Sequence, residues 1–171
     1  MAGAMSDEQL GSLDRDAQDE QKVVTASAVI DAPVGAIFEL IADPARQVEW
    51  DGNDNLGEAA SGQRVREVGD VFATTLTKGS VRDNHVVEFA EGRSIAWMPS
   101  EEGGQPFGQL WRWELAPAAD GTAVVHTYDW SGLPADAVPG RIARARSMTS
   151  DMLMASVVRL KELAEREAAE A

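Results

Sequence analysis

Alternating apolar and polar residues dominate the middle of the chain and predict a series of β-strands. Period-2 alternation that is rich in β-branched and aromatic residues is typical of a strand with one buried face. Short turns that contain glycine separate most of these runs, as antiparallel hairpins require. We therefore predict about seven strands. They cover residues 23–30, 63–68, 71–77, 82–89, 94–99, 108–116 and 122–130.

Helical spacing of apolar residues follows the first strand. Apolar side chains recur every three or four positions from Val34 to Ile41 and form one face of a short helix. Pro33 suits the start of this helix, because the first N–H groups of a helix have no partner within it. Asp43 and Pro44 repeat the start signal and predict a second short helix over residues 44–48.

The last part of the chain predicts one long helix. Residues 138–170 have a helical pattern, with no glycine after Gly140 and no proline after Pro139. A helix of about 30 residues would span roughly 45 Å, enough to cross a whole domain. A series of strands followed by such a helix indicates a sheet wrapped around it. We expect the functional site in the space between them.

Composition places the chain among single-domain proteins without disulfides. Its 171 residues are 44% hydrophobic and 26% charged, and this length is enough to bury a core. The absence of cysteine excludes a disulfide framework, a thiolate metal site and a cysteine nucleophile. Residues 1–21 are polar and acidic, so we expect a disordered segment there and a single domain over residues 22–168.

The net charge of −14 limits the classes of partner. Nucleic acids and anionic membrane surfaces are polyanions that favour Lys and Arg on a protein, so we expect neither as a partner. No apolar run of the sequence approaches the roughly 18 residues of a membrane span, and the first residues lack the apolar region of a signal peptide. We therefore expect a cytoplasmic protein with no stable membrane insertion.

Three segments carry a family pattern: residues 29–50 (VIDAPVGAIFELIADPARQVEW), 90–97 (AEGRSIAW) and 120–132 (DGTAVVHTYDWSG). This pattern resembles the START-related helix-grip superfamily (SRPBCC), which includes polyketide cyclase/dehydrase-like, birch-pollen-allergen-like and lipid-transfer proteins. The resemblance implies an α+β fold in which an antiparallel sheet wraps around a long C-terminal helix, with two short helices after the first strand. It also implies an internal cavity that binds a polyketide, lipid or sterol-like ligand. A minority of the superfamily catalyses cyclisation or dehydration.

Two neighbouring strands carry large aromatic residues on one face. Alternation places Trp111 and Trp113 on one face of the first strand, and His126, Tyr128 and Trp130 on one face of the second. Charged residues occupy the opposite faces, so we expect the aromatic faces inside the protein. They form either an ordinary core, which aromatic residues often dominate, or a cavity wall whose polar tips would meet a ligand.

His126 and Tyr128 are the candidates for catalysis. An imidazole with an ordinary pKa of about 6.5 can act as an acid or a base, and Tyr128 lies ~6.8 Å along the same strand face. The pair could bracket an enolisable polyketide. Alternatively, His126 bonds a neighbour or orients a ligand. His85 is expected to face inward with Val87 and Phe89 if their strand has no bulge.

The predicted ligand-binding residues come from the inward strand faces and from the start of the last helix. They are Phe72, His85, Val87, Phe89, Trp97, Trp111, Trp113, Trp130, Met148 and Met152. The methionines would form an adaptable wall, because their side chains are flexible and polarizable. Arg141 and Arg144 lie either on the solvated surface or at the cavity mouth, where they would engage an acidic group of the ligand.

No motif names a reaction, a metal or a cofactor. His85 and His126 have no HxH or HExxH partner, and the glycines of residues 101–108 match neither GxGxxG nor a P-loop. We expect no cofactor, no metal, and an apolar small molecule as the partner of a monomer or homodimer. Three functions stay open: a binding protein, a polyketide cyclase or dehydratase that uses His126 and Tyr128, and a stress or regulatory protein that acts through its surface.

Overall fold

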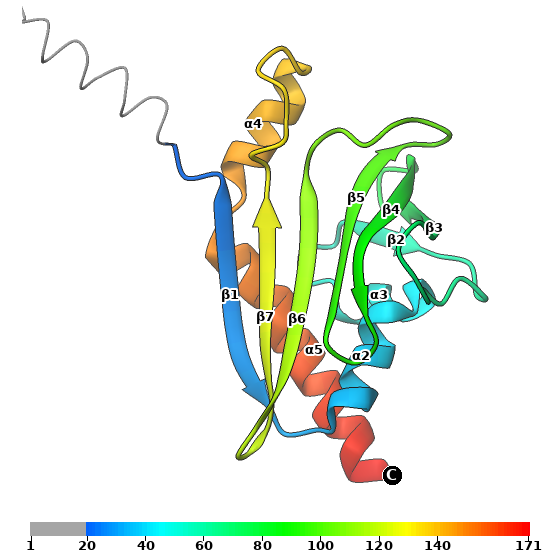
Figure 1. Ribbon diagram of the computed structural model, residues 1–171, viewed down its shortest axis with the longest axis vertical. Coiled ribbons are helices and arrows are strands. Elements are labelled where there is room, and N and C mark those ends of the chain that lie inside the picture. Colours follow the sequence, from blue (N-terminus) through cyan, green and yellow to red (C-terminus); the bar gives the residue numbers. More distant parts are fainter. Residues whose placement is uncertain (1–19) are drawn as a thin grey trace, which may run out of the picture.

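A computed structural model describes residues 20–171, and within them a seven-stranded antiparallel sheet curls along the C-terminal helix (Figure 1). The strand order is β1-β7-β6-β5-β4-β3-β2, so the first strand pairs with the last. The strands are β1 (Val23–Ile30), β2 (Leu56–Glu58), β3 (Val71–Leu76), β4 (Val81–Ala90), β5 (Ser94–Glu101), β6 (Leu110–Ala118) and β7 (Gly121–Asp129). The helices are α2 (Val34–Ala42), α3 (Pro44–Trp50), α4 (Pro139–Ser147) and α5 (Ser150–Glu170).

This arrangement confirms the predicted α+β helix-grip fold. The segment that we expect to be disordered lies, up to residue 19, outside the described residues. Both short helices form where predicted, and both pack on α5. The carboxylate of Asp43 caps α3 by accepting a bond from the Ala45 N–H at 3.1 Å. Helix α3 continues to Trp50, whose Nε1 donates to the Leu40 carbonyl at 2.7 Å and ties the two helices together.

The prediction of one continuous helix over residues 138–170 is wrong. Helix α4 ends at Ser147 and α5 begins at Ser150, with Met148 and Thr149 extended between them. The Thr149 hydroxyl accepts a bond from the Met152 N–H at 3.3 Å and so caps α5. A threonine side chain that bonds the backbone in this way stabilises a helix start and competes with a helix interior. Figure 1 shows α4 set apart from α5 at one end of the sheet.

The strand predicted over residues 63–68 is also absent from the described fold. Residues 66–70 form a turn in which the Asp70 carboxylate accepts bonds from the Arg66 and Glu67 N–H groups. The side chain of Gln63 exchanges two hydrogen bonds with the backbone of Ala73 and thereby takes the place of a neighbouring strand on β3. The edge strand of the sheet is instead β2, which pairs with β3.

The predicted inward face of β4 is wrong in part, because this strand contains a bulge. The pairing register with β5 shifts between Val86 and Glu88. Before the shift the inward residues are Asn84 and Val86, which are buried, whereas Val87 is exposed. After the shift Phe89 faces inward. The bulge therefore turns His85 and Val87 outward, contrary to the expectation for an unbulged strand.

The loop after α3 lies directly on α5. A side chain at Gly52 would place its Cβ only 2.4 Å from the backbone of Ala155, so only glycine fits there. The Gly52 N–H donates to the Ser156 hydroxyl at 3.0 Å. This contact fixes the loop that forms one side of the space between the sheet and α5.

Candidate ligand-binding cavity

A cavity of about 610 Å³ lies between the concave face of the sheet and α3, α4 and α5. Its walls combine aromatic and aliphatic side chains with polar and charged ones. The aromatic side chains are Trp50, Trp97, Phe107, Trp111, Trp113, His126 and Tyr128. The polar and charged side chains are Gln47, Asp51, Asn53, Asn55, Thr74, Arg82, Asn84, Gln109, Arg141, Arg144, Ser147 and Ser156.

The pairing of β6 with β7 builds the aromatic wall. Trp113 lies opposite His126 and Trp111 lies opposite Tyr128 in the strand register. The rings of Trp113 and His126 are stacked with centroids 3.7 Å apart, and those of Trp111 and Tyr128 lie 4.4 Å apart. Trp50 of α3 meets Trp113 edge-on at 5.1 Å. The predicted inward faces of both strands are therefore correct.

His126 is a neutral imidazole of fixed tautomer. Its Nδ1 lies 3.1 Å from the backbone carbonyl of Arg112, which can only accept a hydrogen bond, so Nδ1 carries the hydrogen. The other nitrogen, Nε2, is then a free acceptor. Burial lowers the pKa of His126 to about 4, and the bond to Arg112 offsets only part of this shift.

Tyr128 offers a hydroxyl in the same cavity. Its oxygen accepts a bond from the Gln109 side chain at 3.0 Å, which leaves the hydroxyl hydrogen available to an acceptor. Burial raises the pKa of Tyr128, while the Gln109 bond and the positive charge of Arg144 act in the opposite direction. The phenol is therefore protonated at neutral pH and can act as a hydrogen-bond donor.

The indole Nε1 of Trp113 has no hydrogen-bond partner. Of the buried side-chain nitrogen and oxygen atoms of the described residues, this one alone lacks a hydrogen-bond partner. Buried polar groups in native proteins are nearly always bonded, so such an atom requires an explanation. Trp113 is fully buried and belongs to the cavity wall.

The structure brings most of the predicted site residues together, and it separates the others. The cavity is lined by Trp97, Trp111, Trp113, His126, Tyr128, Met148 and Met152, together with Arg141 and Arg144. The predicted residues outside the lining are Phe72, His85, Val87, Phe89 and Trp130.

Each residue outside the lining has another environment. Phe72 is buried against Trp97, and Phe89 packs on the ring of Phe38 in α2. His85 bonds the Ser100 hydroxyl at 2.9 Å, and the exposed Val87 lies at the bulge. Trp130 is buried as predicted, but it lies beyond the cavity under the ammonium group of Lys22.

Several lining residues were not predicted as site residues from the sequence. Asn84 is buried and donates to the Phe72 carbonyl and the Thr74 hydroxyl, both at 3.1 Å. The bulge hid its orientation. Gln109 precedes Trp111 and Trp113 at the same strand parity, so alternation already placed it on their face. Phe107 lies in a loop, where no periodicity could reveal it.

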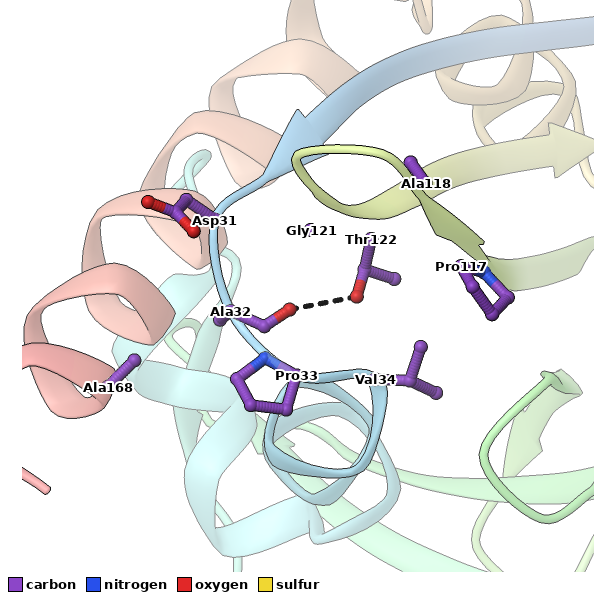
Figure 2. Close-up of a pocket in the computed structure, with 9 residues that line it drawn as sticks. All are labelled: Asp31, Ala32, Pro33, Val34, Pro117, Ala118, Gly121, Thr122 and Ala168. Carbon is purple, nitrogen blue, oxygen red and sulfur yellow. Dashed lines mark hydrogen bonds between the residues drawn. The ribbon is translucent and has the colours of Figure 1, made fainter.

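Figure 2 shows another hollow, at the end of the sheet away from α4. It is shallow and lies between the β1–α2 turn, the β6–β7 turn and the end of α5. The Thr122 hydroxyl donates to the Ala32 carbonyl across it at 2.9 Å, and the remaining walls are mostly small apolar residues. This hollow has no free buried polar group, so we assign it a structural role in joining β7 to the β1–α2 turn.

The described residues contain no group of three or more His, Cys, Asp or Glu side chains that could hold a metal ion. None of the helices between residues 20 and 171 combines the length and the apolar character needed to cross a bilayer.

Comparisons with known proteins agree with this architecture. Residues 21–165 match the family model described as polyketide cyclase/dehydrase and lipid transport. The fold is similar to that of major latex-like protein 151 from Panax ginseng, with 14% identity, a TM-score of 0.56, and coverage of 83% of this chain and 96% of that chain. It is also similar to the Aha1 dimer from Colwellia psychrerythraea, with 16% identity, a TM-score of 0.58, and coverage of 85% and 97%.

DynU16, a protein of the dynemicin biosynthetic locus, is a third similar structure. It shares 18% identity with a TM-score of 0.61, over 86% of this chain and 49% of that chain. At these identities the similarities show the fold alone. The family match confirms the resemblance to the helix-grip superfamily. No curated protein matches the chain significantly.

Proposed function

The chain belongs to the polyketide cyclase/dehydrase and lipid-transport family, and we propose that it binds an apolar or aromatic small molecule in the cavity beneath its sheet. The volume of about 610 Å³ suits a polyketide, lipid or sterol-like compound, because ligand pockets typically measure about 300–1,000 Å³. Ligand pockets usually have apolar and aromatic walls with polar groups that orient the ligand, and the aromatic wall of β6 and β7 fits this composition. We further propose a monomer or homodimer in the cytoplasm.

One observation carries this proposal: polar atoms without protein partners lie in the aromatic wall. Nε2 of His126 is an acceptor with no protein hydrogen bond, since only Nδ1 of that ring is bonded. Tyr128 adds a hydroxyl hydrogen that no protein group accepts. A closed core would leave these groups unsatisfied, at a cost of about 1–3 kcal/mol each. A bound molecule with matching oxygen atoms would satisfy them.

A polyketide cyclase or dehydratase is the second candidate. It is favoured by the position of His126 and Tyr128, which line the same cavity and belong to one face of β7. Their pKa values oppose proton transfer, however. An imidazole with a pKa of about 4 is a weak base at neutral pH, and burial makes the phenol of Tyr128 a weaker acid than usual. We therefore propose that both residues orient a ligand.

Native mass spectrometry of the purified protein, followed by extraction and identification of small molecules, tests the binding proposal. We expect a retained apolar compound at near-stoichiometric level. If none is retained, titration with pyrenebutanol, a neutral aromatic probe, decides the question through energy transfer from tryptophan. Trp111→Ala should weaken probe binding tenfold or more, because Trp111 is a half-buried part of the wall.

Trp130→Phe is the matched control, since Trp130 is buried outside the cavity. It should leave the affinity within twofold of the unmodified protein. Equal loss of affinity in both variants, or no binding by the unmodified protein, would contradict the proposal. Turnover of a retained polyketide that is abolished in His126→Gln while its affinity persists would favour the enzyme instead.

A further inference from the structure

Three arginines line the cavity without making an ion pair to any described residue. Arg82 comes from β4, and Arg141 and Arg144 come from α4. Elsewhere in the structure carboxylates neutralise many of the cations. The paired ones are Arg46, Arg64, Arg112, Arg146, Arg159 and Lys161. The chain has 29 acidic residues against 15 Lys and Arg, so acidic partners are abundant. Three arginines that have no acidic partner are therefore gathered at one cavity opening.

The three guanidinium groups are held in place by neutral partners. The Arg141 guanidinium lies 3.6 Å from the ring centroid of Phe107, and that of Arg82 lies 5.5 Å from the same ring. Arg144 donates to the side-chain oxygen of Asn55 at 2.7 Å. Aromatic and amide contacts orient a guanidinium group but do not cancel its charge. Since Arg144 is exposed and Arg82 and Arg141 are half-buried, these groups mark the opening of the cavity.

The cavity lining offers little negative charge to oppose them. Among the described residues, Asp51 is the one acidic residue of this lining. The Asp51 carboxylate accepts bonds from the N–H groups of Asn53, Asn55 and Leu56, at 3.2, 2.7 and 2.7 Å, so it is engaged in holding its own loop. The opening consequently has a net positive charge inside a strongly negative protein.

We infer that the ligand is an acid, with its apolar or aromatic body against the tryptophan wall and its carboxylate at Arg82, Arg141 and Arg144. This inference rests on the proposed binding function and adds the charge of the ligand to it. Guanidinium groups bind carboxylates through paired N–H donors, and such charge-assisted bonds are about twice as strong as neutral ones. The positive charge of Arg144 acts to lower the pKa of Tyr128, which is consistent with an orientation of Arg144 toward the cavity.

Two probes that share one aromatic body test the inference. Pyrenebutyric acid and pyrenebutanol differ in a carboxylate against a hydroxyl group, and both report binding by energy transfer from tryptophan. The unmodified protein should bind the acid at least tenfold more tightly. Raising NaCl from 50 to 500 mM should weaken binding of the acid and leave binding of the alcohol unchanged, because salt screens only the charged probe.

Substitutions at the opening assign the preference to these residues. Arg141→Gln and Arg144→Gln should each weaken binding of the acid three- to tenfold and change the alcohol less than twofold. Arg93→Gln is the control, since Arg93 is an exposed arginine in the β4–β5 turn outside the cavity lining. It should affect neither probe. If an arginine variant does not fold, the salt comparison on the unmodified protein still decides.

The outcomes separate the two proposals. Equal affinity of the unmodified protein for acid and alcohol would overturn the acidic ligand and leave the proposed binding function standing. A preference for the acid that survives in both cavity variants, or is lost equally in Arg93→Gln, would also overturn it. Binding of neither probe would instead count against the proposed function itself.

Discussion

The imidazole of His126 lies flat on the indole of Trp113, with ring centroids 3.7 Å apart and ring planes 13° apart. The two residues are directly opposite each other on β7 and β6. This stacking buries most of the imidazole, which disfavours the charged form. Within the same pair, Nε1 of Trp113 has no protein partner. A single cross-strand pair therefore supplies both the apolar surface and the unsatisfied polar atoms of the cavity wall.

Burial of His126 predicts a specific dependence of stability on pH. Its pKa is about 4 in the folded protein and about 6.5 in an unfolded chain. Between these values the unfolded state binds more protons, so the free energy of unfolding falls as the pH is lowered from about 6.5 to about 4. Above that range the group has no effect. At pH 5 the loss relative to pH 7 should be about 2 kcal/mol.

Urea unfolding of the unmodified protein and of His126→Gln at pH 7 and pH 5 measures this difference. The variant has no imidazole at this position, so it should lose about 2 kcal/mol less than the unmodified protein over the same interval. An NMR titration should also place the His126 resonance midpoint near pH 4. Equal pH slopes for the two proteins, or a midpoint near pH 6.5, would contradict the prediction.

The two tryptophans of β6 should differ in their contribution to stability. Trp113 is fully buried and touches Trp50 and His126, so Trp113→Ala should lower the free energy of unfolding by about 3–5 kcal/mol. Trp111 is half-buried and faces the cavity, so Trp111→Ala should cost less, roughly 1–2 kcal/mol. Denaturant unfolding provides both values. A larger loss for Trp111→Ala than for Trp113→Ala would show that the cavity wall is in fact solid core.

The parity of aromatic residues on β6 and β7 was readable from the sequence, because both strands pair without a bulge over the relevant residues. Trp111, Trp113, His126 and Tyr128 accordingly lie where alternation placed them. The helix starts at Pro33 and Asp43 were equally visible, since proline suits a helix start and the Asp43 side chain caps α3. These features use interactions between residues that are close in sequence or that follow a strict period.

The errors arose where one backbone interaction changes the orientation of a whole segment. The bulge after Val86 reverses the inward face of β4, and no residue type in that strand signals it. Thr149 could occupy a helix interior, yet its hydroxyl caps α5 and lets α4 turn toward the cavity opening. Trp130 has the correct parity but lies past the end of the cavity. That distinction depends on where α4 sits, which the pattern of residues 138–170 does not reveal.

A pair of glycine substitutions tests the contact between the α3–β2 loop and α5. Gly52→Ala would put a Cβ 2.4 Å from the Ala155 backbone, so the loop or the helix must move, and we expect a loss of about 1–3 kcal/mol. Gly35→Ala is the matched control in α2, where a Cβ meets no atom within 4 Å. There alanine should stabilise the protein by up to about 1 kcal/mol. Thermal and urea unfolding of both variants gives the comparison, and a neutral Gly52→Ala would contradict this close approach.

Helix α5 should depend on its threonine cap. Thr149→Ala removes the hydroxyl that accepts the Met152 N–H bond, so we expect the free energy of unfolding to fall by about 1 kcal/mol. Because alanine also favours the helical conformation, the break between α4 and α5 should become less stable. Thr149→Ser keeps the hydroxyl and serves as the control, with a loss of a few tenths of a kcal/mol at most.

The same variants report on the cavity, because α4 carries Arg141 and Arg144 to its opening. If the break at Thr149 positions α4, Thr149→Ala should weaken binding of pyrenebutyric acid more than binding of pyrenebutanol, and Thr149→Ser should change neither. Hydrogen exchange at Thr149 should slow in Thr149→Ala as its N–H group enters a helical bond pattern. Unchanged exchange and unchanged stability in Thr149→Ala would show that packing of α4, and not the threonine cap, separates the two helices.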